Sequence, residues 1–305
     1  MDKRSVLVLA GIFGGVFVAL FGFLFLSWSV VQGGGRAKLG DGRVGVVEIK
    51  GEIMESDEAV KQLHDFLEDD EIQAVVVRVD SPGGAVAPSQ EIYTEVKRLA
   101  EKKHVVVSMG GVAASGGYYL AAPADRIFAN PGTLTGSIGV ISQIPNIAGI
   151  TEKLGFEMNT VKSGEAKDAG NPFRAFTDED RAIFQAMIDK VYLQFVRAVA
   201  EGRELPEDKV REVADGRVIT GEDALALGLV DEMGNFRDAV SAAAKMAGIE
   251  GEPQLVYPPE DKHFVWEQVF ANGARAAVRA GAEELRGQLE SPADGPLLQY
   301  LLPGH

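Results

Sequence analysis

The hydrophobic positions of this 305-residue chain form two kinds of pattern, and the first lies at the N-terminus. From Val6 to Val31 nearly every residue is apolar, and no charged residue lies between Arg4 and Arg36. About 20 apolar residues span a bilayer as a helix, so residues 1–31 are predicted to hold a transmembrane anchor. A cleaved signal peptide is the alternative, but its apolar core is about 7–15 residues long and precedes a small-residue cleavage site.

The second pattern begins after a Gly-rich tether at residues 32–43, which has no periodicity. From there, short β-branched runs alternate with amphipathic segments. Strands are expected at 44–49, 74–79, 105–109, 127–129, 138–141 and 157–162, and helices at 57–68, 89–102, 115–122 and 177–202. Val-rich strands that alternate with helices predict an α/β fold with a buried, mostly parallel sheet. We assign residues 44–250 to one catalytic domain and 251–305 to a C-terminal helix and an extended tail.

Composition excludes several classes of function. A hydrophobic content of 46% excludes wholesale disorder, and a net charge of −15 argues against nucleic acid as a partner. The absence of cysteine excludes disulfides, thiolate catalysis and cysteine metal sites. No motif indicates a metal or a cofactor, and none is expected.

The most informative motif is a serine among very small residues, at 110–119 (GGVAASGGYY). Ser115 follows the apolar run Val105–Val107, so its hydroxyl is expected at a strand-to-helix turn, beside free backbone N–H groups. A serine nucleophile needs a base, which is usually histidine. The histidines lie at 64, 104, 263 and 305. None follows Ser115 before residue 263, so the sequence favours a lysine base, with Lys162 and Lys167 as candidates.

A second loop, Asp80-Ser81-Pro82-Gly83-Gly84, closes an earlier strand. Pro followed by Gly predicts a type II turn, and the second glycine allows a ligand to approach the backbone closely. In a parallel sheet this loop and the Ser115 loop leave the same edge, so the N–H groups of Gly84 and Gly116 could meet at one oxyanion. An ordinary strand–helix turn is the alternative interpretation.

Four segments together carry a family resemblance: 80–84, 110–122 (GGVAASGGYYLAA), 135–140 (TGSIGV) and 162–168 (KSGEAKD). Their order and spacing, over about residues 44–250, resemble the short form of the signal peptide peptidase A family. The resemblance implies a Clp protease/crotonase-like fold, a repeated β-β-α spiral with mostly parallel strands, preceded by one N-terminal transmembrane helix.

The resemblance also implies roles for individual residues. They are Ser115 as nucleophile, Lys167 as general base, Gly84 and Gly116 as oxyanion donors, Ser137 as the hydroxyl that orients the lysine amine, and Gly83 and Gly111 in the substrate groove. A lysine base must be neutral, so the pKa of Lys167 has to be lowered by burial or a positive neighbour. The carboxylate of Asp168 would oppose that shift and is therefore expected to point away.

The function expected from this resemblance is a membrane-anchored serine endopeptidase that hydrolyses remnant signal peptides, and other unfolded peptides, through an acyl-enzyme. A homo-oligomer, an octamer by resemblance, would share each site between protomers. Lys3 and Arg4 favour a cytoplasmic N-terminus and a body outside the cytoplasm, although Arg36, Lys38 and Arg43 weaken that bias.

Three alternatives stay open at this point. A stomatin-associated membrane serine protease shares the dyad, a crotonase-type acyl-CoA enzyme shares the fold, and a non-enzymatic scaffold would leave Ser115 inert. Near the C-terminus, Trp266 and Phe270 begin a helical apolar stripe that suits core packing, subunit packing or a membrane surface. The apolar tail at 295–302 could reach the substrate groove.

Overall fold

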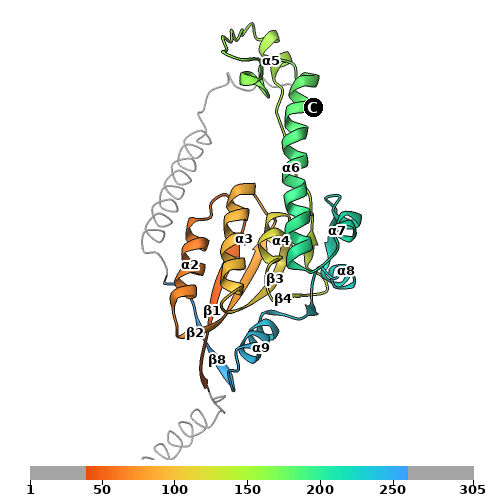
Figure 1. Cartoon of the computed structure of the whole chain (residues 1–305). Coiled ribbons are helices and arrows are strands. Elements are labelled where there is room, and N and C mark those ends of the chain that lie inside the picture. The colour runs from red at the N-terminus through yellow and green to blue at the C-terminus, as the bar shows by residue number, and fades with distance from the viewer. Residues whose placement is uncertain (1–38, 260–305) are drawn as a thin grey trace, which may run out of the picture. The chain divides into compact units, whose positions relative to one another are not determined.

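The computed structural model describes residues 39–259 (Figure 1). The predicted anchor, residues 32–38 of the predicted tether, and residues 260–305 of the predicted C-terminal helix and tail lie outside these residues. Two predicted boundaries are wrong: residues 39–43 begin a strand and are not tether, and Glu252–Val256 form a strand that pairs with it instead of belonging to a C-terminal helix or tail. Within 39–259 no helix is both long enough and apolar enough to cross a membrane.

The fold is built on one sheet of mostly parallel strands, as the sequence predicts. Its central order is β6-β5-β3-β2-β1-β8, and β4 pairs with the first half of β3 and with β7. Among the described pairings only β5 with β6 is antiparallel. The strands are β1 (Leu39–Lys50), β2 (Ile72–Ser81), β3 (His104–Ala114), β4 (Arg126–Ala129), β5 (Leu134–Gly136), β6 (Val218–Thr220), β7 (Glu232–Met233) and β8 (Glu252–Val256).

Helices cover both faces of the sheet (Figure 1). They are α2 (Asp57–Glu68), α3 (Val86–Ala100), α4 (Gly116–Ala121), α5 (Ala148–Lys153), α6 (Asp178–Gly202), α7 (Glu207–Val213), α8 (Gly221–Ala226) and α9 (Phe236–Met246), with a 3₁₀ turn, η1, at Glu165–Asp168. Helices are needed on both faces because alternate side chains of β2 point to opposite faces of the sheet, and both sets are apolar. Val75, Val77 and Val79 enter the larger core beneath α2, α3 and α4, whereas Ala74 and Val76 pack against α9.

Two of the expected strands are wrong. Residues 138–141 form no strand, because the preceding strand β5 ends where Gly136 and Ser137 take positive φ angles of 72° and 50°. Residues 157–162 form none either, and Met158 and Val161 in that segment are exposed. An apolar run forms a buried strand only where its side chains pack into the core of the chain. The side chains of Met158 and Val161 do not pack there.

Helix α6 extends well beyond the core. It begins at a capping box, in which Thr177 Oγ1 accepts from the Asp180 N–H and the Asp180 carboxylate accepts from the Thr177 N–H. Its buried apolar residues all lie near its C-terminal end, from Phe195 onward. Its N-terminal end carries residues 141–176, including α5 and η1, which we call the arm (Figure 1).

Candidate functional site

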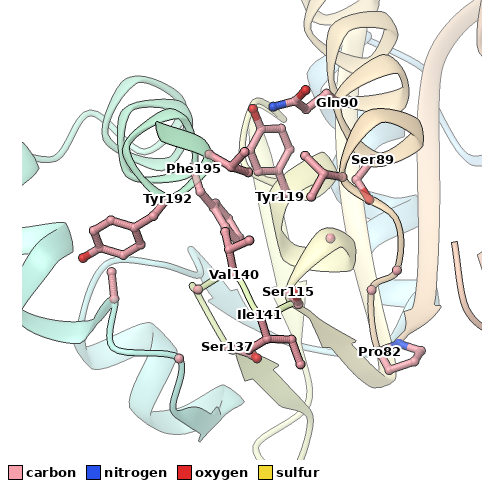
Figure 2. Close-up of a pocket in the computed structure, with 18 of the residues that line it drawn as sticks. Pro82, Ser89, Gln90, Ser115, Tyr119, Ser137, Val140, Ile141, Tyr192 and Phe195 are labelled. Carbon is pink, nitrogen blue, oxygen red and sulfur yellow. The ribbon is translucent and has the colours of Figure 1, made fainter. Parts of the chain in front are cut away.

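Ser115 stands at a strained turn between β3 and α4. Its φ and ψ angles are 53° and −120°, a region that costs a non-glycine residue about 1–3 kcal/mol. Two hydrogen bonds hold the turn: the Ser115 N–H donates to Gly136 O at 2.9 Å, and Ser115 O accepts from the Tyr119 N–H at 2.8 Å. Within the described residues Ser115 Oγ has no hydrogen-bond partner, and the residue lines a cavity of about 670 Å³ (Figure 2). The fold thus presents a free hydroxyl to a large cavity.

The Pro-Gly-Gly loop places a backbone donor beside this hydroxyl. Gly83 has a φ of +98°, which fits the predicted type II turn. The Ile53 N–H donates to Gly83 O at 3.0 Å, and the Ala85 N–H donates to Ile53 O at 2.7 Å. In such a bridge the hydrogen-bonding groups of the middle residue, Gly84, point away from Ile53.

Gly116 supplies a second donor. A methyl group placed at Gly116 would lie 3.3 Å from the Gly84 nitrogen, so the two loops are in close contact. Over residues 39–259 neither the Gly84 N–H nor the Gly116 N–H has a hydrogen-bond acceptor. Two unpartnered N–H groups next to a free serine hydroxyl can stabilise the oxyanion of acyl transfer.

The far end of the cavity is apolar and aromatic (Figure 2). The rings of Tyr119 and Phe195 lie 4.9 Å apart between centroids, and Tyr192 also lines the cavity. Ser115 and Ser137 lie at the other end, beside Val140 and Ile141 (Figure 2). The cavity can therefore hold an apolar side chain while its carbonyl lies near Ser115.

The titratable groups of the cavity are poor candidates for a general base. Among the described lining residues there is no lysine or histidine. Hydrogen bonds from Arg217 lower the pKa of Asp215 to about 2, so its carboxylate is weakly basic. Burial raises the pKa of Tyr119. The other lining carboxylate is that of Glu52.

The candidate lysines both lie on the arm. Lys167 is in η1 with an exposed side chain and takes part in no ion pair within the described residues. Lys162 donates to Asp168 at 2.8 Å, and this hydrogen bond raises the pKa of the Lys162 amine. Asp168 also accepts from Arg174, so its carboxylate is directed to these two cations. The Asp168 carboxylate thus holds the Lys162 amine in its charged form.

The structure therefore brings most of the predicted site residues together, but not all of them. Gly83, Gly84, Ser115, Gly116 and Ser137 line the same cavity. Lys167 does not line it.

Gly111 also lies outside the lining residues, on an exposed part of β3 beside Asp80. Asp80 itself accepts from the Val112 N–H at 3.0 Å, which is a structural role. The catalytic, oxyanion, orienting and groove roles stay predictions.

Two parts of the cavity wall were not anticipated from the sequence. Val191 and Phe195 on α6 are four residues apart, a spacing that marks an apolar helix face and could have suggested a buried contact. The segment 214–216 reaches the site because β6 pairs with β5, and the Ser137 N–H donates to Arg217 O at 2.8 Å. No local pattern in the sequence signals that long-range pairing.

Comparison with known proteins agrees with this geometry. The protein-family model described as peptidase family S49 matches residues 97–250. The chain belongs to peptidase family S49. A Synechocystis relative named "Putative protease" is 46% identical over 209 residues, which are 68% of this chain and 76% of the relative. The protein is accordingly a serine endopeptidase. The two alternatives of a crotonase-type acyl-CoA enzyme and a non-enzymatic scaffold are therefore excluded.

Further relatives extend the comparison. "Putative signal peptide peptidase SppA" of Enterococcus faecium is 39% identical over 67% of this S49 peptidase and 59% of its own length. "Serine protease SPPA, chloroplastic" of Arabidopsis thaliana is 36% identical over 73% of this chain and 34% of its own. The Clp protease family model matches residues 43–133, which hold β1 to β4 and the Ser115 turn, and this supports the expected Clp protease-like fold.

Proposed function

We propose that this S49 peptidase is a membrane-anchored endopeptidase that cleaves remnant signal peptides with a Ser115–Lys167 dyad. The observation that carries the proposal is the strained Ser115 turn, where a free hydroxyl adjoins the unpartnered N–H groups of Gly84 and Gly116. Signal peptides are apolar, which suits the aromatic end of the cavity. The name of the Enterococcus faecium relative points to the same substrate class.

The proposed chemistry is acyl transfer in two halves. The neutral amine of Lys167 takes the proton of Ser115 Oγ, and the oxygen attacks the scissile carbonyl carbon. The tetrahedral oxyanion accepts hydrogen bonds from Gly84 and Gly116. The intermediate collapses, the C–N bond breaks, and the leaving amine takes the proton from Lys167. Water, deprotonated by the same amine, then attacks the acyl carbonyl carbon. The ester bond to Ser115 breaks, the protonated amine returns its proton to Ser115 Oγ, and the carboxylic acid product leaves. The Ser137 hydroxyl orients the lysine throughout.

We infer further that each dyad is shared between two protomers. The arm that bears Lys167 is fixed to Asp180, and from Asp180 to Val191, the first residue of α6 in the cavity wall, the helix rises about 16 Å. The cavity has no base of suitable type among its described lining residues. Lys167 of one protomer would then serve Ser115 of its neighbour in a closed ring, an octamer by resemblance. The exposed apolar residues of the arm, among them Ile150, Leu154 and Val161, suit a protein contact.

The membrane location is proposed from the apolar stretch Val6–Val31. With the N-terminus in the cytoplasm, the catalytic domain lies outside it, where signal peptides are released. External protease added to spheroplasts should then degrade the catalytic domain while a cytosolic control protein survives. Protection of both would reverse the proposed orientation.

Covalent labelling tests the dyad. A fluorophosphonate should modify Ser115 in the assembled wild-type protein, as mapped by mass spectrometry, because the label reacts with an activated serine. Ser115→Ala should show no label. Lys167→Ala should show no label either, and its rate of peptide hydrolysis should fall by about 10⁴-fold. The matched control is Lys153→Ala, which removes an exposed lysine from α5 of the same arm and should label normally.

Other outcomes would contradict the proposal. If Lys167→Ala labels at the wild-type rate and Lys162→Ala does not, the base is misassigned. If hydrolysis continues in Ser115→Ala, the nucleophile is another residue.

A further inference from the structure

The turn that carries Lys167 is held at both ends by a network of charged side chains. We call it the clasp, and its members are Lys162, Asp168, Arg174, Thr177 and Asp180. It joins η1 to the first turn of α6, which the capping box of Thr177 and Asp180 already orders. Lys167 lies inside the span that the clasp holds but is not part of the network.

Arg174 is the centre of the clasp. Its guanidinium donates to both carboxylate oxygens of Asp180, at 2.5 and 2.9 Å, in the paired geometry that only arginine provides. Its Nε donates to Asp168 Oδ2 at 3.0 Å, and Nη2 donates to the Asp168 carbonyl at 2.9 Å. The Asp180 side chain is only 5% exposed, so the guanidinium is attached to an ordered, buried anchor. One side chain thus fixes the end of η1 to the helix.

Lys162 holds the other end of the turn. Its amine donates to the Glu165 carbonyl at 3.0 Å and to Asp168 Oδ1 at 2.8 Å. Both carboxylate oxygens of Asp168 are therefore occupied by cations other than Lys167. Lys167 is left with an exposed amine and no ion pair within the described part of the chain.

We propose that Arg174 is a positioning residue for the reaction, which presents Lys167 in a fixed geometry and keeps the Asp168 carboxylate from pairing with the Lys167 amine. This inference rests on the proposed function, in which Lys167 is the general base. A base that is too firmly paired with a carboxylate stays protonated and cannot accept the serine proton. In the sequence, Asp168 directly follows the proposed base Lys167, and its carboxylate would favour the protonated lysine. The clasp directs that carboxylate to Lys162 and Arg174 instead.

Two variants of the clasp should shift the pH dependence of hydrolysis in opposite directions. The charged groups on and around η1 are Lys162, Glu165, Asp168, Arg174 and Asp180. Removing the Arg174 charge makes these surroundings more negative and so favours the protonated Lys167 amine. The acid limb of the pH profile, in which kcat/KM rises with pH as Lys167 loses its proton, then moves to higher pH. Replacing Asp168 by Asn makes them more positive and moves the limb to lower pH. If both residues had a purely structural role, the two substitutions would not shift the limb in opposite directions.

The clasp stays closed over the pH range in which this limb is measured. Hydrogen bonds from Lys162 and Arg174 lower the pKa of Asp168, and hydrogen bonds from Arg174 and Thr177 lower the pKa of Asp180. A carboxylate with a lowered pKa contributes stability above its ordinary pKa of about 3.9, which is lost only as pH falls through the folded value. A limb above about pH 5 therefore reports Lys167 rather than opening of the clasp.

The experiment measures kcat and KM against pH for the full-length protein on a fluorogenic peptide. Arg174→Met should move the acid limb up by about one pH unit and lower kcat, and Asp168→Asn should move it down. Arg174→Lys keeps the charge but not the paired geometry, so kcat should fall about tenfold while the limb and KM stay near wild type. Arg98→Met, which breaks an exposed pair with Glu95 in the last turn of α3, is the matched control and should match wild type.

Folding and assembly are checked by circular dichroism and by sedimentation. If Arg174→Met does not fold or assemble, Asp168→Asn still tests the downward shift of the limb and Arg174→Lys still tests the loss of kcat, and wild-type behaviour of both would overturn the inference. The inference is overturned if the Arg174 variants keep the wild-type kcat and pH profile while Lys167→Ala is inactive. It is also overturned if Arg174→Met and Asp168→Asn shift the limb in the same direction. Full activity of Lys167→Ala would instead remove the proposed base itself.

Discussion

The Ser115 hydroxyl and the unpartnered N–H groups of Gly84 and Gly116 lie close together within residues 39–259 of one chain. The positive φ of Ser115 keeps its Oγ in the cavity, and its N–H bond to Gly136 places it beside the loop of Ser137. A serine with small neighbours and a Pro-Gly-Gly turn are local signals, so these residues could be singled out from the sequence, while an ordinary turn stayed the alternative interpretation of the second loop. The choice of Lys167 over Lys162 came from the family resemblance, because no local signal separates the two lysines. In the structure their ion-pair partners differ, since Lys162 pairs with Asp168 and Lys167 takes part in no ion pair within the described residues. Those partners depend on how the arm folds.

At the residue scale, the account predicts the pH dependence of hydrolysis. Activity needs neutral Lys167, so kcat/KM should rise with pH, with an apparent pKa below the ordinary value of about 10.4. Ser137→Ala should lower kcat at the plateau and alter this limb, because the amine loses a hydrogen-bond partner. The limb should persist in Asp215→Asn, since Asp215 has a pKa of about 2. A limb that disappears in Asp215→Asn would assign the base to that carboxylate.

At the scale of elements, the long β-branched runs and the long helices were predictable. Valine is the most frequent residue at the buried positions of β1, β2 and β3, and α6 has a complete capping signal. The two- and three-residue strands β5, β6 and β7 were not predicted, because their pairing is decided by tertiary contacts. They matter for function, since the β5–β6 pairing brings residues 214–216 to the cavity.

The contact between α4 and the Pro-Gly-Gly loop gives a prediction at this scale. In Gly116→Ala the new methyl group would lie 2.4 Å from Ser89 Oγ and 3.3 Å from the Gly84 nitrogen, so Ser89 must turn away from its bond to Ala85 O and the proposed Gly84 donor must shift by a few tenths of an ångström. Steady-state kinetics should show kcat lowered by up to about 10²-fold with the fold retained. Adding Ser89→Ala removes the closer clash and should restore part of the rate. Gly132→Ala, where a methyl group meets nothing within 4 Å, should match wild type. A fully active Gly116→Ala would argue against this oxyanion site.

In the whole molecule, the arm exposes apolar side chains that no other part of residues 39–259 covers. Leu154 and Val161 are 78% and 101% exposed, whereas the valines of β1 and β2 are buried. Leu154→Asp and Val161→Asp should leave the unfolding temperature of the protomer nearly unchanged and should abolish assembly and hydrolysis together, as measured by sedimentation and peptide cleavage. Assembly at the wild-type affinity would remove the arm from the subunit contact.

The central claim, a serine and a lysine from neighbouring chains, is tested most directly by mixing two inactive variants. Ser115→Ala and Lys167→Ala subunits are co-expressed in equal amounts, and mixed assemblies are verified by distinct tags and native mass spectrometry. Each dyad then has an intact serine half of the time and an intact lysine half of the time, so random assembly should restore about a quarter of wild-type activity. Verified mixed assemblies with no activity would show that both residues come from one chain and would contradict the shared site.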